Sequence, residues 1–338
     1  MSLFLVMATY NGESFLREQL DSLVGQSVRE WTLLIRDDGS HDATVAILDE
    51  YAGRDGRIRR VEDGLGGLGA VANFARLMEQ ARDRGASRLF LVDQDDVWMP
   101  GKIAGELALL EEGEGRFGAG TPLLVHSDMA VVDEFCRERS PSFMDYQMIR
   151  HEEQDPLCVL VVQNFVTGCT ALLNRPLLEL ALPIPDGVPM HDWWLALVAV
   201  AAGRILYLPR ATLCYRQHGA NQVGASGVWR TAWRSLTGRG PGRGMMADFA
   251  RSVHQAQLLV ERLKKSGLYR EGDPEHSLLR AYCELFGARL PWYRRVMGLR
   301  RLGVRRQHPI RQFRLYLQAA LWGGRRRRLQ GLSHRKPG

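Results

Sequence analysis

Short apolar runs alternate with amphipathic stretches over roughly the first 130 residues. The apolar runs, rich in Leu, Ile and Val, predict strands at residues 3–8, 32–36, 58–61, 88–92 and 123–127. Between them, apolar residues recur at helical spacing and predict helices at residues 13–25, 42–53, 70–84 and 101–112. Strands that alternate with helices are typical of an α/β fold with a mainly parallel sheet flanked by helices.

The pattern changes along the rest of the chain. Residues 130–225 are less regular and predict a strand at 168–173, a helix at 192–202, and strands near Ile205 and Leu213. From about Trp229 the pattern is helical, with helices expected at 246–265 and 275–289 before an arginine-rich end. We therefore expect a domain at 1–225, with halves at 1–130 and 131–225, followed by a helical region at 226–338.

Composition narrows the class of protein. The 338 residues are 45% hydrophobic, which is enough for one large α/β domain and an appendage or for two domains. Five cysteines without a CxxC pair favour reduced thiols in a cytoplasm over a disulfide framework or a zinc site. The first apolar run has no basic residues before it and predicts a strand, not a signal peptide. The longest later apolar stretch, 193–203, is too short to span a membrane.

The net charge of +7 is distributed unevenly. Residues 289–338 hold 15 Lys and Arg and no Asp or Glu, so the preceding 288 residues hold 30 basic and 38 acidic residues. A basic surface that attracts a partner is therefore expected at one end of the chain only.

Three polar motifs follow predicted strands. They are residues 9–12 (TYNG), 37–40 (DDGS) and 93–96 (DQDD). In an open parallel sheet, ligands bind at the carboxyl ends of the strands. The three motifs therefore point to one site.

The third motif crowds three carboxylates, Asp93, Asp95 and Asp96. Asp96 could cap the next helix, but capping does not account for all three. Asp93 and Asp95 alternate onto one side of an extended segment and suit Mg²⁺ or Mn²⁺ shared with phosphate oxygens.

Two further motifs near this edge are ambiguous. Asp37 and Asp38 could form a simple turn or could bind a base or ribose. Residues 64–69 contain GxGxxG, which raises a dinucleotide-binding alternative, although that fingerprint belongs to the first βα turn rather than the third. We interpret this loop as a donor-binding turn, with Asn73 as a polar contact.

The second half of the domain contains two candidate motifs. Asp192, in the HDWW segment at 191–194, could be a helix cap or a general base beside aromatic rings that stack on a sugar. In the YRQHGAN segment at 215–221, Arg216 could clamp a diphosphate and His218 could bind a metal, unless the segment is a solvated loop.

Together these motifs resemble family 2 glycosyltransferases with the GT-A fold, a Rossmann-like fold, and in particular the rhamnosyltransferase-like members. The resemblance covers about residues 3–225 in family order. It rests on ATYNG at 8–12, DDGS at 37–40, GLGAVANF at 67–74, DQDDVW at 93–98 with Lys102, NFVTGCTALLNR at 164–175, HDWW at 191–194 and YRQHGAN at 215–221.

The resemblance implies a role for each matching residue. The nucleotide sugar would be bound by Thr9, Tyr10, Asn11, Asp37, Asp38, Gly69, Asn73, Asp93, Gln94, Lys102 and Arg216. Asp95, Asp93 and His218 would hold the metal. Asp192 would be the general base of an inverting transfer. The acceptor would contact Asp128, Trp98, His191, Trp193 and Trp194.

The resemblance also bears on substrates. The QxxRW signature of processive synthases is absent, which favours transfer of a single sugar. We expect dTDP-L-rhamnose as the donor, with UDP-hexoses as the alternative and a nucleotidyltransferase or NAD-binding enzyme as a weaker one. A saccharide or lipid-linked saccharide of the bacterial cell surface would be the acceptor.

The C-terminal end lies outside the resemblance. It interleaves arginines with Trp292, Tyr293, Phe313, Tyr316 and Trp322 and closes on the arginine run 325–328. Such a segment suits an anionic membrane surface, where Trp and Tyr lie at headgroup depth. A solvated basic tail is the alternative, and we do not expect nucleic acid as a partner. The chain would then be cytoplasmic and peripheral on the inner face of the membrane.

Overall fold

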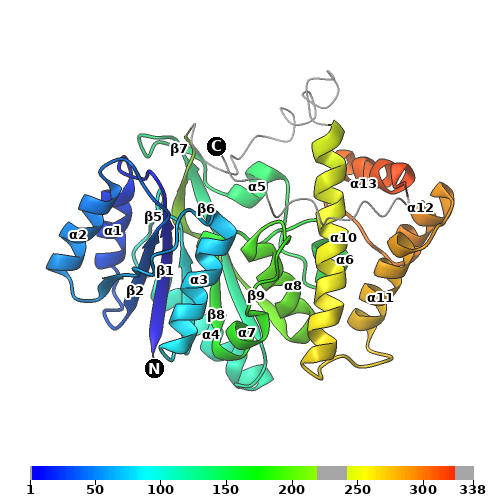
Figure 1. Cartoon of the computed structure of the whole chain (residues 1–338), viewed down its shortest axis with the longest axis horizontal. Coiled ribbons are helices and arrows are strands. Elements are labelled where there is room, and N and C mark those ends of the chain that lie inside the picture. Colours follow the sequence, from blue (N-terminus) through cyan, green and yellow to red (C-terminus); the bar gives the residue numbers. More distant parts are fainter. Residues whose placement is uncertain (1, 219–241, 324–338) are drawn as a thin grey trace.

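The computed structural model describes residues 2–218 and 242–323 (Figure 1). Its strands are β1 (Leu3–Thr9), β2 (Thr32–Asp37), β3 (Ile58–Arg60), β4 (Arg88–Val92), β5 (Val97–Trp98), β6 (Leu123–Val132), β7 (Glu138–Ser140), β8 (Leu172–Asn174) and β9 (Arg204–Arg216). Its helices are α1 (Leu16–Val24), α2 (Thr44–Arg54), α3 (Ala70–Asp83), α4 (Lys102–Phe117), α5 (Phe143–Gln147), α6 (Pro156–Leu160), α7 (Arg175–Ala181), α8 (His191–Ala202), α10 (Gly242–Lys265), α11 (Pro274–Gly287), α12 (Trp292–Arg301) and α13 (Pro309–Leu321).

The strands form one mixed sheet in the order β3-β2-β1-β4-β8-β6-β9-β5, with β7 beside β6. β1 to β4 are parallel, and β6 is parallel to β9. β8 runs antiparallel between β4 and β6. The carboxyl ends of β1, β2 and β4 therefore meet at one edge, where the three polar motifs begin.

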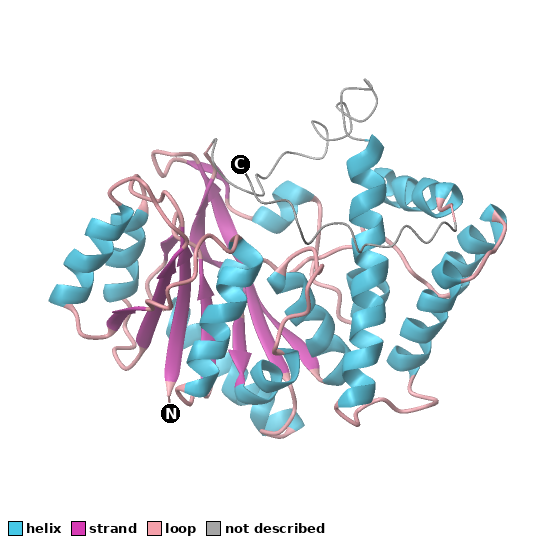
Figure 2. Cartoon of the chain, viewed as in Figure 1, coloured by secondary structure: helices cyan, strands magenta, loops and turns pink. Residues whose placement is uncertain are grey.

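Helices cover both faces of the sheet (Figure 2). The alternation of β1 shows how the two faces are filled: Leu3, Leu5 and Met7 pack with α1, α2 and α4, whereas Phe4 and Val6 pack with α3, α7 and α8. Successive side chains of a strand point to opposite faces, so one apolar strand contributes to both cores. The predicted fold class is confirmed.

The C-terminal helices extend the second of these cores. α10 runs beside α8, and α11, α12 and α13 lie beyond it (Figure 1). Phe249 and Val253 of α10 and Leu315 of α13 belong to the same buried apolar cluster as α8. Arg262 of α10 also donates to the carbonyls of Leu180 and Leu182 at 2.8 and 2.7 Å. Residues 242–323 therefore pack against the sheet domain. The expected boundary near residue 225 lies outside the described residues.

Gly203 allows a close approach between α8 and β6. A Cβ at this position would lie 1.8 Å from the carbonyl oxygen of Pro122, which is a backbone atom that cannot move aside. The helix therefore ends at a residue without a side chain, and β9 begins directly after it.

Two expected elements differ in the structure. The strand expected at 168–173 is a 3₁₀ turn at Gly168–Thr170 followed by the short β8. The two strands expected near Ile205 and Leu213 are one strand, β9. Pro209 and Arg210 interrupt the pairing of β9 with β6, since consecutive residues of β6 pair with Leu208 and Ala211. In the sequence, the proline at this bulge suggests the end of one strand and the start of another.

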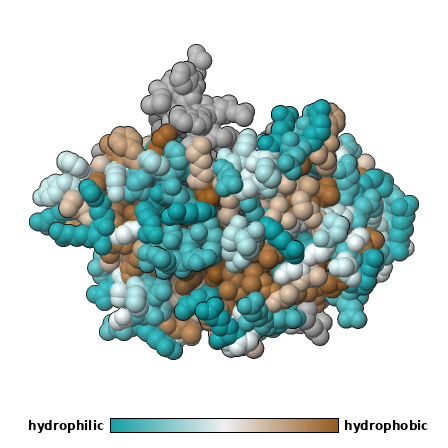
Figure 3. All heavy atoms as spheres, turned by 180° about the vertical axis from the view of Figure 1, so that it is seen from behind, coloured by the Kyte–Doolittle hydropathy of each residue, from teal (hydrophilic) through white to brown (hydrophobic). Residues whose placement is uncertain are grey.

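Hydrophilic side chains cover most of the face seen from behind, with apolar ones gathered near its lower middle (Figure 3). Within the described ranges, no helix combines the length and the apolar character that crossing a bilayer requires.

Candidate active site

A cavity of about 1270 Å³ lies at the carboxyl ends of β1, β2 and β4 and extends to the start of α8. Thirteen of the residues expected from the sequence line it: Thr9, Tyr10, Asn11, Asp38, Gly69, Asn73, Asp93, Gln94, Asp95, His191, Asp192, Trp193 and His218. The structure thus brings together side chains from six separate sequence motifs.

Gln94 joins the first motif to the third. Its side-chain oxygen accepts from the amide of Tyr10 at 2.9 Å, and its side-chain nitrogen donates to the Tyr10 carbonyl at 3.1 Å. A Cβ on Gly12 would lie 2.5 Å from that oxygen of Gln94, so any side chain at this position would displace the Gln94 amide. The Tyr10 ring is exposed in the cavity, where its position suits stacking on a flat base.

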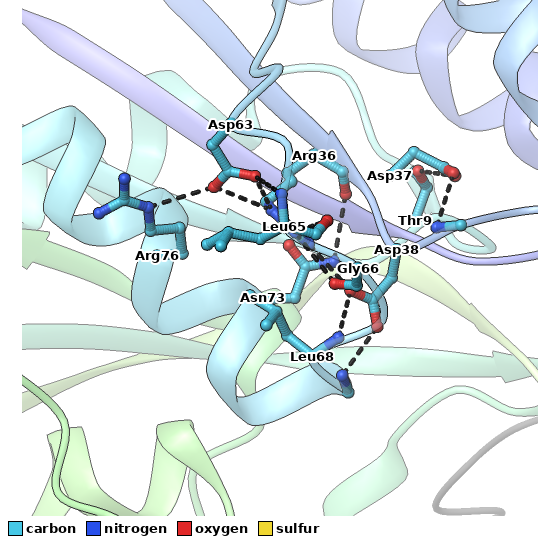
Figure 4. A network of polar contacts seen from close by, with 12 residues as sticks. Thr9, Arg36, Asp37, Asp38, Asp63, Leu65, Gly66, Leu68, Asn73 and Arg76 are labelled. Atoms are coloured by element: carbon cyan, nitrogen blue, oxygen red, sulfur yellow. Dashed lines mark hydrogen bonds and ion pairs between the residues drawn. The ribbon is translucent and has the colours of Figure 1, made fainter. Parts of the chain in front are cut away.

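Asp37 organises the turn after β2 and does not line the cavity. Its carboxylate accepts from the hydroxyl of Thr9 at 2.9 Å (Figure 4). It also accepts from the hydroxyl of Ser40 at 2.6 Å and from the amides of Gly39 and Ser40 at 3.0 and 2.7 Å. These four hydrogen bonds occupy it, so the expected direct contact with a nucleotide is replaced by a supporting role.

Asp38 holds the glycine-rich loop against the cavity. Its carboxylate accepts from the amides of Leu68 and Gly69, both at 2.7 Å, and pairs with the buried Arg36 at 2.8 Å (Figure 4). Asn73, on the first turn of α3, donates to the Arg36 carbonyl at 3.2 Å. The loop that carries GxGxxG is thus fixed by a carboxylate of the chain itself.

The ligand atoms of Asp93, Asp96 and Cys169 lie within 4.8 Å of one another, the one such group among the described residues, so the expected set of Asp93, Asp95 and His218 is not gathered that closely. Asp95 Oδ2 lies 2.8 Å from His218 Nε2. Burial, with the charges of Asp95 and Asp192, raises the pKa of Asp93 to about 7. Asp96 is fully buried, and its Oδ2 has no hydrogen-bond partner in the described part of the chain. Carboxylates crowded in this way repel one another, and a cation would relieve the repulsion.

Asp96 does not cap α4, whose N-cap residue is Gly101. Its Oδ1 instead accepts from the amide of Arg216 at 3.3 Å. The Arg216 guanidinium donates to the carbonyls of Asp95 and Glu134 at 3.1 and 2.7 Å and pairs with Glu18. Arg216 is buried and does not line the cavity. It therefore positions the Asp95 loop and does not act as the diphosphate clamp that we expected.

Asp192 lies in the first turn of α8, after the N-cap residue Met190. Its carboxylate accepts from the amide of Gly168 at 3.0 Å and from the side-chain nitrogen of Asn164 at 3.2 Å. Burial raises the pKa of Asp192 to about 6, although hydrogen bonds from the backbone oppose this shift. A carboxyl with this pKa is deprotonated near neutral pH and basic enough to accept a proton.

Four other expected contacts lie away from the cavity. They are Lys102, Trp98, Trp194 and Asp128. Lys102 is buried and pairs with Glu106 at 2.5 Å, with the buried ring of Trp98 beside it. The Trp194 indole is buried and donates to the Ala181 carbonyl at 2.9 Å. These three side chains face the core because they lie on the inward sides of their elements.

Asp128 is the fourth of these residues. It accepts from the hydroxyl of Ser142 at 2.5 Å and from the amides of Phe143 and Met144 at 3.1 and 3.2 Å, so its carboxylate holds the start of α5. The remaining aromatic candidates do line the cavity. His191 stacks on Phe74 at 4.2 Å.

The cavity also includes residues that the sequence did not single out. They are Phe15, His41, Phe143, Gln147, Ile149, Gln163, Asn164, Phe165 and Arg311 among others. Asn164 begins the NFVTGCTALLNR segment of the family resemblance, but no function was assigned to it from the sequence. Arg311 comes from α13 and carried no local signal, because only the packing of α13 against residues 147–163 brings it to the cavity. Gly219, Ala220 and Asn221 of the YRQHGAN motif, Trp229 and the 325–328 run lie outside the described residues.

Comparison with known proteins gives consistent results. The family described as Glycosyl transferase family 2 matches residues 4–178. The dTDP-rhamnosyl transferase RfbG of Shigella flexneri is 26% identical over 236 residues, which cover 68% of this chain and 78% of that protein. The putative teichuronic acid biosynthesis glycosyltransferase TuaG of Bacillus subtilis is 30% identical over 174 residues, covering 51% of this chain and 61% of its own length. The crystal structure of S. aureus TarS 1–349 with UDP-GlcNAc aligns with a TM-score of 0.52 at 16% identity, over 94% of this chain and 90% of that one, which supports the fold.

Proposed function

This chain belongs to glycosyl transferase family 2, and on that premise we propose that it transfers a single sugar with inversion from a nucleotide-sugar donor to a saccharide or lipid-linked saccharide acceptor. The observation that carries this proposal is one cavity lined both by the Asp93, Asp95 and His218 cluster and by Asp192. The first group suits a cation and a diphosphate. The second suits removal of a proton from an acceptor hydroxyl. Synthesis of bacterial surface polysaccharide is the process in which we place the reaction.

In this proposal, different residues of the cavity bind the nucleotide, hold the metal and remove the proton. Tyr10, Asp38 and the glycine-rich loop bind and orient the nucleotide, and Asp192 takes the proton as the acceptor oxygen attacks the anomeric carbon. Mg²⁺ or Mn²⁺ held by Asp93, Asp95 and His218 would offset the charge of the leaving diphosphate. Asn164 and Gly168 keep the Asp192 carboxylate in place through their hydrogen bonds.

We place dTDP-L-rhamnose first among donors, since the motif combination and the similarity to RfbG both favour it. A UDP-activated hexose is the alternative within the same family. An NAD-binding enzyme is disfavoured, because the GxGxxG loop follows β3, whereas the dinucleotide fingerprint belongs to the first βα turn.

A thermal-shift panel of dTDP, UDP, GDP and NAD, each with and without Mn²⁺, tests the donor. We expect dTDP to raise the melting temperature by several degrees with Mn²⁺ and little without it, because a ligand at about 100 times its Kd adds roughly 2.7 kcal/mol to the free energy of unfolding. A larger shift with UDP would change the donor and keep the reaction class. Stabilisation by NAD, independent of metal, would contradict the proposal.

We also propose that α12 and α13 attach the protein to an anionic membrane surface, where lipid-linked acceptors are found. The exposed apolar residues of these helices are Trp292, Tyr293, Met297, Phe313, Leu317 and Leu321. Arginines flank them, and residues 289–338 contain no acidic residue. Apolar insertion together with basic charge is the combination that binds such surfaces.

Vesicle flotation with a matched pair of variants tests the membrane proposal. Phe313 in α13 and Phe135 in the β6–β7 hairpin are each 69% exposed, so Phe313→Ser and Phe135→Ser remove the same exposed ring from different places. We expect Phe313→Ser to weaken binding to vesicles with phosphatidylglycerol by about tenfold, since burying one aromatic side chain contributes roughly 1.5–3 kcal/mol. Phe135→Ser should bind like the unmodified protein. Equal binding by both variants would contradict the role of α13.

A further inference from the structure

Three arginines at and just before α13, Arg306, Arg311 and Arg314, lie close enough for their charges to act on one another. Arg311 lines the cavity and donates to the carbonyls of Gln147 and Met148 at 2.7 and 3.4 Å. The Arg306 guanidinium donates to the Val162 carbonyl at 3.1 Å. We call Arg306, Arg311 and Arg314 the arginine cluster. The guanidinium groups of Arg306 and Arg311 thus donate to backbone carbonyls, which carry no net charge.

No member of the arginine cluster has a direct ionic partner in the described part of the chain. The buried Nε of Arg314 has no hydrogen-bond partner there either. Asp248 is the acidic group that acts on Arg306, and it pairs with Arg251 at 2.5 Å.

The charges in the cluster act on one another. Burial, assisted by the charges of Arg314 and Arg311, lowers the pKa of Arg306 to about 10. Burial and the Arg314 charge lower the pKa of Arg311 as well. Positive charges held this close are stabilised when an anion binds between them.

The cluster lies on the Asp192 side of the cavity. Gln307, just before α13, accepts from the side chain of Gln163 at 3.1 Å and its own amide donates back to Gln163 at 3.2 Å. The next residue, Asn164, donates to Asp192. Two hydrogen-bonded steps thus connect the segment that carries the cluster to the expected base, whereas the donor motifs lie at the ends of β1, β2 and β4.

We infer that the arginine cluster binds a phosphate group carried by the acceptor, an inference that rests on the proposed function and makes its acceptor specific. Guanidinium groups bind phosphate through paired N–H donors, and Arg311 is the member that reaches the cavity. Phe143, Ile149 and Phe165 add apolar walls to the same cavity, which suit a phosphate attached to an apolar group. Arg306 and Arg314 strengthen the positive field behind Arg311.

Calorimetric titration of phosphate esters into the nucleotide-saturated protein tests this site. The nucleoside diphosphate that stabilises the protein most, with Mn²⁺, first fills the donor half, and glycerol 1-phosphate or farnesyl phosphate is then added. We expect Arg311→Gln to weaken binding of both esters about tenfold and Arg311→Lys to recover part of it. Arg59→Gln, at an exposed arginine of β3, is the matched control and should change nothing.

The outcomes separate this inference from the proposed function. A loss for both esters supports a phosphate site, and a loss for farnesyl phosphate alone supports a lipid-linked phosphate. Equal binding by Arg311→Gln and the unmodified protein would overturn the inference, provided that the variant keeps its stabilisation by nucleotide. Failure of every nucleotide to bind would instead count against the proposed function.

Discussion

Replacement of Asp192 by asparagine is expected to lower the kcat of sugar transfer about a thousandfold, the middle of the range that a positioned general base contributes. Asparagine keeps the size of the side chain but accepts no proton from the acceptor hydroxyl. Asp192 lies at the start of α8, on a different element from the residues expected to hold the nucleotide. Metal-dependent stabilisation by nucleotide should therefore survive in the variant. The measurement is initial-rate kinetics at saturating donor.

The pH profile gives this prediction a second readout. The carboxylate form of Asp192 is the active one, and burial raises its pKa to about 6. Above that value the base is deprotonated and the rate is at its plateau. Below it the deprotonated fraction falls tenfold for each pH unit, so kcat should fall from pH 6 towards pH 4. The residual activity of Asp192→Asn should lack this limb at saturating Mn²⁺, where titration of Asp93 does not limit metal binding.

A matched control is available six residues earlier. Asp186 is exposed in the loop before α8, and Asp186→Asn makes the same chemical change outside the cavity. It should leave both kcat and the pH profile unchanged. A kcat for Asp192→Asn within tenfold of the unmodified protein would remove Asp192 as the base.

Much of the fold could be predicted because the first half of the chain has clear local signals. β1 and β4 are apolar on both faces and are bounded by polar residues, and α3 has apolar residues at helical spacing. The short elements had no such signal. β5 has two residues and is defined by its pairing with β9, a contact between positions more than 100 residues apart. No local pattern encodes that contact.

The candidate site was predictable where side chains follow strands of known direction, and less so elsewhere. Strand ends brought Thr9, Asp38 and Asp95 to one edge as expected. Lys102 lies nine residues after Asp93, but it faces the core, because the orientation of α4 and not sequence distance decides which side chains reach the cavity. Arg311 lies more than 100 residues after Asp192, and only the packing of α13 brings it to the cavity.

Asp95 gives the complementary prediction, because it lies in the half of the cavity that faces the donor. Asp95→Asn is expected to lower kcat by roughly a hundredfold or more, since a bound cation contributes several kcal/mol to the stabilisation of the leaving group. The variant removes the carboxylate that lies 2.8 Å from His218 Nε2. It should also lose the Mn²⁺-dependent part of nucleotide stabilisation, which Asp192→Asn retains.

This contrast between the two variants tests whether the two halves of the cavity have different tasks. Asp83→Asn, at an exposed position at the end of α3, controls for the loss of one negative charge. If Asp95→Asn kept full Mn²⁺-dependent stabilisation by nucleotide, Asp95 could not be a metal ligand, and the raised pKa of Asp93 would then reflect burial and repulsion alone. If both variants lost nucleotide binding equally, Asp192 would belong to the donor half. This arrangement of carboxylates predicts that Asp95→Asn loses the metal dependence and that Asp192→Asn loses the fall in rate at low pH. Each variant then loses one step, metal-dependent donor binding or proton removal, and keeps the other.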